Sequence, residues 1–149
     1  MKLSNLTNIL TLLGIQLIFF NTVFCRPPQN AGGFAKTCGI PRLEGKNHDR
    51  LFVECSTPVD DTKPTGELKW RETSLDLNEC IANNDGMLVP QRNGGFSGSC
   101  DGSYTHIEDI VEHWRIRSNC KKADGRVRGS VLNLNLFVRN TKGKIHCNV

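Results

Sequence analysis

The chain has 149 residues, and 19 lysines and arginines against 15 aspartates and glutamates give it a formal charge of +4. This modest excess of positive charge does not require nucleic acid or an anionic membrane as a partner. Aromatic residues make up only 7% of the chain, whereas glycine, asparagine, serine and threonine are common. Such a composition favours short strands and many turns over a helical core.

The N-terminal segment is predicted to be a secretory signal peptide. Lys2 precedes an apolar run at 9–20, and Val23 and Cys25 are small enough to stand before a signal-peptidase cut. A transmembrane anchor is the weaker alternative, because the run is shorter than the roughly 20 residues that a span needs. The expected organisation is a signal peptide over 1–25, a flexible leader over 26–32 and one extracellular domain over 33–149.

The first half of the domain contains short apolar segments of the kind found in half-buried strands. An apolar segment at 51–53 and a Leu-Asp-Leu segment at 75–77 predict two strands. Between them, two prolines and a run of acidic and hydroxyl residues predict a loop over 56–65. Asp85-Gly86 then lies between apolar residues, and this pair predicts a β-hairpin because both residues tolerate positive φ.

The second half begins with the one segment that looks helical. Ile107, Ile110 and Val111 fall near one face of a helix predicted over 104–112. Alternating segments at 114–116 and 132–134 predict strands, and Lys142-Gly143 predicts a second hairpin.

The two halves repeat each other, with matching motifs in the same order about sixty residues apart. No linker separates the copies, which are assigned to 33–94 and 95–149 and are expected to form one pseudo-symmetric β-domain with two equivalent surfaces. Two equivalent surfaces indicate binding rather than catalysis. The motifs in copy one are Gly33-Phe34-x3-Cys38, Leu75-Asp76-Leu77-Asn78 and Asn83-x-Asp85-Gly86, and those in copy two are Gly95-Phe96-x3-Cys100, Leu132-Asn133-Leu134-Asn135 and Asn140-x-Lys142-Gly143.

The Leu-Asp-Leu-Asn motif has a structural interpretation. We expect Leu75 and Leu77 to point into the core and Asp76 to point outward, with Asn78 capping a short helical turn over 79–82. For Asn78 and its repeat equivalent, a role in turn formation is favoured over a functional one. For Asn83 and Asp85 of the following hairpin, the two roles are equally supported.

The chain has seven cysteines, of which Cys25 leaves with the predicted signal peptide. The six that remain suit disulfide formation in an oxidising compartment. The repeat pairs Cys38 with Cys55 and Cys100 with Cys120, since these cysteines occupy equivalent places. Cys80 and Cys147 have no repeat counterparts. A bridge between them is one interpretation, and an intermolecular bridge or a buried free thiol are the others.

These motifs together resemble the cyanovirin-N homology family of small sugar-binding proteins, and the resemblance extends from Gly33 to the C-terminus. It implies an elongated all-β fold with pseudo-two-fold symmetry, in which each repeat lends its hairpin to the three-stranded sheet of the other. It also implies the Cys38–Cys55 and Cys100–Cys120 bridges. The implied activity is recognition of mannose-rich glycans at one or two shallow pockets, without metal, cofactor or catalysis. The implied assembly is a monomer or a domain-swapped homodimer.

The resemblance places two pockets on the sequence, of unequal strength. In the first, Ala82, Ala123 and Gly125 replace longer polar residues of the family pattern, and in the second Lys142 replaces an aspartate. We expect the first pocket to bind sugar and the second to be weaker. The first comprises Asn83, Asp85, Ser99, Lys121, Lys122 and the backbone of Gly94 and Gly95, and the second comprises Lys36, Thr37, Ser56 and Asn140.

Residues 101–106 are an insertion relative to the family pattern and are expected to border the first pocket. Tyr104 within it offers an apolar face and a hydroxyl group. It would therefore extend the sugar site, block that site, or simply contribute to packing, and packing is the most common role of a tyrosine.

Two other functions compete with sugar binding. An enzyme would need paired histidines and carboxylates, and Asp109 and His113 would be neighbours on the predicted helix. None of these residues lies within a repeat motif, however. A secreted module that binds protein or polyanion would use a basic strand face, which is also what an ordinary solvated surface looks like. The first alternative draws on His48, His106, His113, His146, Glu108, Asp109 and Glu112, and the second on Arg115, Arg117, Lys121, Lys122, Arg126 and Arg128.

Overall fold

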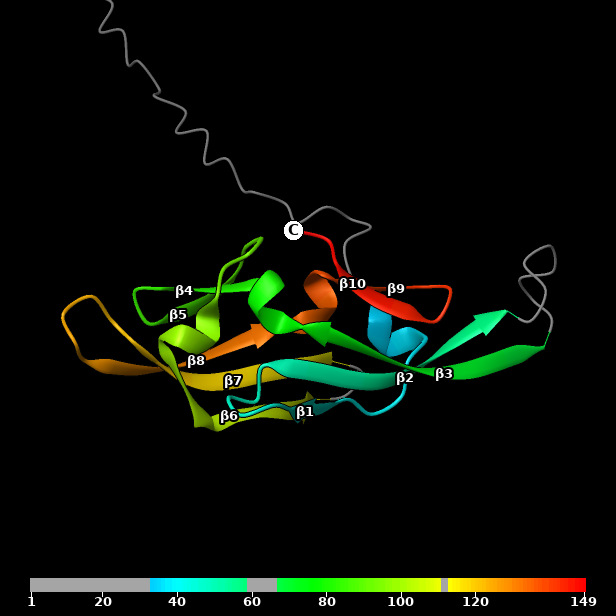
Figure 1. Ribbon diagram of the computed structural model, residues 1–149, viewed down its shortest axis with the longest axis horizontal. Helices are drawn as coiled ribbons and strands as arrows, with labels where there is room; N and C mark the ends of the chain where they lie inside the picture. Colours follow the sequence, from blue (N-terminus) through cyan, green and yellow to red (C-terminus); the bar gives the residue numbers. More distant parts are fainter. Residues whose placement is uncertain (1–32, 59–66, 111–112) are drawn as a thin grey trace, which may run out of the picture.

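The computed structural model describes residues 33–58, 67–110 and 113–149. The predicted signal peptide, the leader and residues 59–65 of the predicted loop lie outside these ranges. The loop prediction is wrong for residues 56–58, which form the end of the strand β2 Arg50–Pro58. Figure 1 shows an elongated molecule with a three-stranded sheet in each half and a two-stranded hairpin over each sheet. No helix in the described ranges is both long and apolar enough to span a bilayer.

Each repeat contributes the same series of elements. One antiparallel sheet has the order β1-β2-β3 and the other β6-β7-β8, and the hairpins are β4-β5 and β9-β10. Single turns of 3-10 helix (η) precede each sheet and each hairpin. The elements of the first repeat are η1 Phe34–Lys36, β1 Arg42–Glu44, β2 Arg50–Pro58, β3 Leu68–Asp76, η2 Leu77–Glu79, β4 Ile81–Asn84 and β5 Met87–Pro90. Those of the second are η3 Phe96–Gly98, β6 Cys100–Ile110, β7 His113–Lys121, β8 Val127–Asn133, η4 Leu134–Leu136, β9 Val138–Thr141 and β10 Lys144–Cys147.

The hairpins are exchanged between the repeats, as the family resemblance implied. The β4-β5 hairpin of repeat one lies over the sheet of repeat two, where the Leu88 N–H donates to Ser130 Oγ at 2.8 Å. The β9-β10 hairpin of repeat two lies over β3 of repeat one, where the Ile145 N–H donates to Thr73 Oγ1 at 3.2 Å. Each half of the molecule is therefore built from both repeats.

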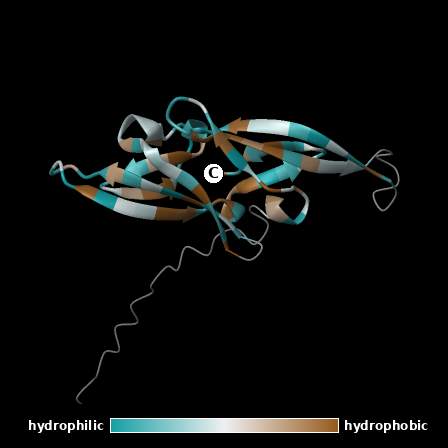
Figure 2. Cartoon of the chain, turned by 90° about the horizontal axis from the view of Figure 1, so that it is seen from below, coloured by the Kyte–Doolittle hydropathy of each residue, from teal (hydrophilic) through white to brown (hydrophobic). Residues whose placement is uncertain are grey.

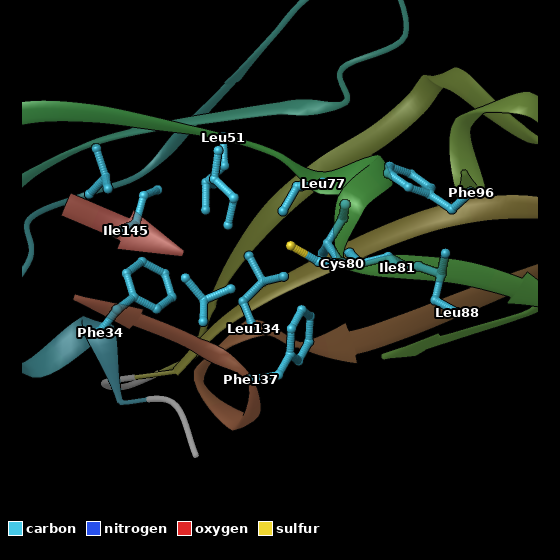
Figure 3. Close-up of a cluster of buried hydrophobic side chains, with 14 of the residues drawn as sticks. Phe34, Leu51, Leu77, Cys80, Ile81, Leu88, Phe96, Leu134, Phe137 and Ile145 are labelled. Carbon is cyan, nitrogen blue, oxygen red and sulfur yellow. The ribbon is translucent and has the colours of Figure 1, made fainter. Parts of the chain in front are cut away.

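The hydrophobic core runs continuously through both halves. Figure 3 shows Phe34 beside Ile145 at one side of the cluster and Phe96 with Ile81 at the other, with Leu77 and Leu134 of the 3-10 turns among the residues between them. All of these side chains are buried. The strands alternate between apolar and polar residues, as Figure 2 shows by hydropathy, and this is the pattern that a half-buried sheet produces.

The Leu-Asp-Leu-Asn prediction is correct for the leucines but wrong for the cap. Leu75 and Leu77 are buried, but the 3-10 turn begins at Leu77 and the Asp76 carboxylate caps it by accepting from the Asn78 N–H at 2.9 Å. The turn starts two residues earlier than predicted because it carries Leu77 into the core. Asn78 instead receives the Ser97 N–H on its amide oxygen at 3.1 Å, which joins the two repeats.

The helix predicted over 104–112 is also wrong. The described part of this segment is the end of β6, in register with β7, so that Ile107 lies opposite Ile116. On the far side of β7, Ile116 lies opposite Leu132 of β8. This cross-strand row of apolar side chains accounts for Ile107, whereas Ile110 is exposed opposite His113 and Val111 lies outside the described residues.

All three proposed disulfides are present: Cys38–Cys55, Cys100–Cys120 and Cys80–Cys147. The first two each close one repeat. The third joins the start of the first hairpin to the last strand of the chain, and so links the two repeats directly. The structure therefore selects the intramolecular bridge among the three interpretations of Cys80 and Cys147.

Candidate functional site

The first predicted pocket lies where the tip of β4-β5 meets the end of the β6-β7-β8 sheet, and Asn83 holds the two together. Its side-chain amide donates both hydrogens, to Ser99 Oγ at 2.9 Å and to the Lys121 carbonyl at 2.7 Å. Its amide oxygen accepts from the Gly86 N–H at 2.8 Å and so fixes the turn. Asn83 therefore positions the site, and only its oxygen has capacity left for a ligand.

Asp85 extends from the hairpin tip toward the turn that follows β7. One carboxylate oxygen accepts from the Ala123 N–H at 2.9 Å, and the other lies 4.0 Å from Lys122 Nζ. The next residue must be glycine, because Gly86 has φ of +84° and a Cβ there would lie 2.8 Å from Lys122 Cγ and 3.1 Å from Arg128 Cβ. The hairpin tip and the turn are thus in direct contact.

The turn itself is held by Asp124. Its carboxylate accepts from the Arg126 N–H at 3.0 Å and from Arg126 Nη2 at 2.6 Å. The Arg126 guanidinium and backbone N–H together hold the pKa of Asp124 below its ordinary value. The Lys122 N–H also donates to the Arg126 carbonyl at 2.8 Å, so the turn is closed by backbone as well as side-chain bonds.

The structure brings the predicted residues of the first pocket to one place. Ser99 and Lys121 are joined by their backbones at 2.9 Å, and Gly95 is bridged to Ala82 of β4. Asp85 and Lys121 are exposed, and Ser99 is half-buried. The Ser99 hydroxyl is engaged within the protein, because it accepts from Asn83 and donates to the Phe96 carbonyl at 3.4 Å. The pocket thus presents a carboxylate acceptor and an ammonium group, which suit a neutral ligand rich in hydroxyl groups.

A hollow of about 480 Å³ adjoins this pocket on the outer face of the β6-β7-β8 sheet, and shares Ser99 and Lys121 with it. Asn119 and Val127 in its lining were not predicted as site residues. A signal for Asn119 was available, since residues alternate along a strand and the buried Cys120 forces Asn119 and Lys121 outward. The full lining is Gly98, Ser99, Cys100, Asp101, Tyr104, Asn119, Lys121 and Val127.

The second predicted pocket has the same three hydrogen bonds around its hairpin asparagine as the first pocket, and we call this set of bonds the frame. Asn140 donates to Thr37 Oγ1 at 3.1 Å and to the Ser56 carbonyl at 3.0 Å, and accepts from the Gly143 N–H at 2.9 Å. The groups around this frame differ. Ser56 stands in the place of Lys121 and donates its hydroxyl hydrogen to the Thr37 carbonyl at 3.0 Å.

Two further residues complete the second pocket. Lys36 is exposed on η1, and Lys142 occupies the hairpin position that Asp85 has in the first pocket. The second pocket therefore has the same hydrogen-bond frame as the first but carries positive charge where the first has a carboxylate.

The residues proposed for catalysis are not arranged as a catalytic group within the described ranges. His113 and Asp109 are not helical neighbours, because they lie on the two strands of a hairpin where Asp109 faces Trp114. His106 Nε2 lies 3.7 Å from Glu108, but Glu108 also forms an ion pair with Arg117. No group of three metal-binding side chains occurs in the described part of the chain. Among the other candidates, His48 bonds the Gly102 carbonyl at 2.7 Å, His146 lies on β10, and Glu112 lies outside the described residues.

Three of the six basic residues considered as a polyanion-binding face form ion pairs. Arg117 pairs with Glu108, Arg126 pairs with Asp124, and Lys122 lies between Asp85 and Asp124. The stem of Arg128 packs against the hairpin glycine although the residue is exposed, and Arg115 is only half-exposed. Lys121 is the member of this set that is exposed and lies in the candidate pocket.

Comparisons with known proteins agree with this architecture. The CVNH domain model matches residues 34–146. The CVNH protein of Gibberella zeae is 23% identical, with a TM-score of 0.64 over 79% of this chain and 99% of that chain. Microvirin in complex with mannobiose is 20% identical, with a TM-score of 0.57 over 76% and 96% of the two chains.

A variant of MoCVNH3 in complex with (N-GlcNAc)4 is 14% identical, with a TM-score of 0.62 over 78% of this chain and 97% of that chain. No curated protein matches the sequence. At these identities the solved structures support the fold alone, whereas the family model covers most of the chain. The chain therefore belongs to the CVNH family, named for cyanovirin-N homology.

Proposed function

We propose that the chain is a secreted lectin that binds mannose-rich glycans at the pocket beneath the β4-β5 hairpin, without catalysis and without a cofactor. The observation that carries this proposal is the set of hydrogen bonds that fixes Asn83, beside which Asp85 and Lys121 are exposed to solvent. Carbohydrate binding on this fold is supported by the complexes of microvirin with mannobiose and of the MoCVNH3 variant with (N-GlcNAc)4.

The chemistry of the pocket favours a neutral sugar. Vicinal hydroxyl groups of a pyranose both donate and accept, so they match the Asp85 carboxylate and the Lys121 ammonium group. The negative charge of Asp85 is partly balanced by Lys122 at 4.0 Å. Because the frame is held by protein hydrogen bonds, little ordering of the pocket is needed on binding.

Sugar binding at the second pocket is proposed to be weaker. Its frame is intact, but the Ser56 hydroxyl hydrogen is already donated to the Thr37 carbonyl. Lys142 at the hairpin tip removes the acceptor that Asp85 supplies in the first pocket. A glycan would therefore lose the carboxylate acceptor of the first site and meet an ammonium group in its place.

The test is to express the full chain in a secreting host and to probe the protein from the medium on a glycan array. N-terminal sequencing should give Arg26 if the signal peptide is cut as proposed. The variant Asp85→Asn/Lys121→Met should lose binding to mannose-rich glycans. It removes the carboxylate charge of Asp85 and the ammonium donor of Lys121, while the asparagine still accepts the Ala123 N–H. Lys36→Met, an equally exposed lysine of the second pocket, is the matched control and should retain binding.

Salt dependence separates this proposal from binding to a polyanion. Binding through hydroxyl groups should change little with ionic strength, whereas binding of an acidic polysaccharide or protein through the basic residues should weaken steeply. Folded, disulfide-intact protein that binds no glycan on the array, or binds only acidic ones in a salt-sensitive way, would contradict the proposed function.

A further inference from the structure

The outer face of the β6-β7-β8 sheet exposes a tyrosine and a valine beside the proposed sugar pocket. Tyr104 is 60% exposed and Val127 is 62% exposed, and both line the 480 Å³ hollow that shares Ser99 and Lys121 with that pocket. Lys121 lies opposite Val127 in the register of β7 and β8, so the hollow begins where the pocket ends. Apolar side chains so exposed beside a hollow suggest a binding surface.

Tyr104 is held in this position from both sides. It lies in the irregular part of β6 between Asp101 and His106, where the register with β7 shifts. On one side the Asp101 carboxylate accepts from the Ser103 N–H at 2.9 Å and the Ser103 hydroxyl at 2.7 Å. On the other side the buried Thr105 hydroxyl bonds the Asp101 carbonyl at 2.8 Å.

Thr105 also anchors this segment to the neighbouring strand, since its hydroxyl lies 2.7 Å from that of the buried Ser118. The backbone on both sides of Tyr104 is therefore fixed although the Tyr104 side chain is exposed. An exposed aromatic side chain on a fixed backbone contacts a ligand at a low cost in conformational entropy.

Asn119 supplies the polar group between the two apolar side chains. It lies opposite Gly129 on β8, and a Cβ at Gly129 would lie 3.4 Å from the Asn119 amide oxygen. A glycine at this position keeps the face above the amide open. An asparagine amide donates and accepts at once, which matches a pair of sugar hydroxyl groups.

We propose that Tyr104, Asn119 and Val127 form a second sugar-ring subsite, continuous with the hairpin pocket through Ser99 and Lys121. The C–H face of a pyranose would lie on Tyr104 and Val127, and its hydroxyl groups would bond Asn119. Asp101 and Lys121 carry opposite charges at the rim, so the ring bound here is neutral. The ligand of this end is then an oligosaccharide of at least two sugars, and this inference rests on the proposed function.

The other half of the molecule has different residues at the equivalent positions. Glu54 of β2 takes the place of Asn119 and lies opposite Glu72 of β3, where repeat two has glycine. Trp70 takes the place of Val127. Glu72 also pairs with Arg42 at 2.6 Å, so this face presents charged groups and an ion pair where repeat two has an amide opposite glycine. The subsite is therefore proposed for the first pocket alone.

The test compares a monosaccharide with a trisaccharide by NMR titration of the isotope-labelled, secreted protein. Methyl α-mannoside reports on the hairpin pocket and a linear α-mannotriose on the pocket plus the subsite. Tyr104→Ala should weaken mannotriose binding by about fivefold or more and leave methyl mannoside binding unchanged, as expected when an aromatic binding residue is truncated. Tyr104→Phe should retain most of the affinity, because the ring face is kept.

Val127→Ala and Val131→Ala provide a matched pair on the same strand. Val127 lines the hollow, whereas Val131 is exposed on the same face but lies opposite Arg117. Only Val127→Ala should weaken mannotriose binding. In the unmodified protein, bound mannotriose should give nuclear Overhauser effects to the Tyr104 ring, a readout that does not depend on any variant.

The outcomes distinguish the two proposals. If methyl mannoside binds but Tyr104→Ala leaves mannotriose affinity unchanged and no effects to the Tyr104 ring appear, the subsite is wrong and the proposed function stands. If the folded protein binds neither methyl mannoside nor mannotriose nor any other glycan, the proposed function is wrong, and the subsite proposal is then wrong as well.

Discussion

The Cys80–Cys147 disulfide should be the most stabilising of the three bridges. It spans 67 residues, compared with 17 for Cys38–Cys55 and 20 for Cys100–Cys120. On the chain-entropy account, a bridge stabilises the folded state by restricting the unfolded chain, and this effect grows with the length of the loop it closes. We therefore predict that Cys80→Ala/Cys147→Ala is the most destabilising of the three possible bridge removals.

The magnitude follows from the loop. The Cys100–Cys120 bridge lies inside this loop, and subtracting its 20 residues from 67 leaves an effective loop of 47 residues. A loop of this length corresponds to about 4 kcal/mol, against about 3 kcal/mol for the Cys38–Cys55 loop. Alanine suits the Cys80 position because that side chain is fully buried, so no polar group is placed in the core.

The assay is thermal unfolding by calorimetry without reductant. With about 2.1 cal/mol/K of unfolding entropy per residue over residues 33–149, a loss of about 4 kcal/mol lowers Tm by about 15 °C. The matched control is Cys38→Ala/Cys55→Ala, which should lower Tm by about 12 °C. A drop of less than about 5 °C for the Cys80–Cys147 removal, or a larger drop for the control, would refute the reasoning.

Three other predictions concern the frame of the pocket and the exchange of the repeats. Asn83→Ala and Asn140→Ala should each lower the free energy of unfolding in urea by about 1–3 kcal/mol, since each removes three side-chain hydrogen bonds, but only Asn83→Ala should abolish glycan binding at the first pocket. Arg126→Gln should raise the pKa of Asp124 toward its ordinary value of 3.8 in a carboxyl NMR titration, because the guanidinium that lowers it is removed. On acidification, the Asp124 carboxylate of the variant is then protonated at a higher pH than that of the unmodified protein. The hydrogen bonds that it accepts within the turn are lost at that higher pH. Removing the bridge that joins the repeats should raise the fraction of domain-swapped dimer in light scattering at high protein concentration, and a purely monomeric variant would contradict this.

The sequence predicted the parts of the fold that the duplication constrains. Both hairpins were predicted because Gly86 and Gly143 follow residues that adopt positive φ, and two bridges were predicted because the repeat aligns their cysteines. The helix predicted over 104–112 failed because Ile107 faces Ile116 across strands, a long-range pairing that local periodicity cannot show.

The candidate site was predicted less completely than the fold. The sequence placed Asn83 among ligand-binding residues, but the structure shows both of its amide hydrogens donated to Ser99 and Lys121. Whether an asparagine forms a turn or contacts a ligand depends on partners that are distant in sequence, so its local motif does not decide between them. Val127 in the adjoining hollow carried no signal of its own, because its place opposite Lys121 depends on the register of β8.

The internal repeat separates the residues that hold the hairpin from those that select a ligand. Asn83 and Asn140 make the same three kinds of hydrogen bond in their respective halves, and Gly86 and Gly143 both lie against an arginine, Arg128 and Arg71. Features shared by both halves cannot make one half bind a sugar that the other rejects. Any difference in binding must come from the positions that differ.

Those positions lie at the hairpin tip and on the outer face of the sheet. Asp85 at the first tip is replaced by Lys142 at the second, and Asn119 opposite glycine is replaced by Glu54 opposite Glu72. Both replacements change charge while the backbone frame stays the same. Exchanging the tips through Asp85→Lys and Lys142→Asp should therefore weaken binding at the first pocket without raising the second to the affinity that the first had, because Ser56 still stands in the place of Lys121 and Glu54 in the place of Asn119. Sugar binding that follows the aspartate to the second half would instead assign selectivity to the tip alone.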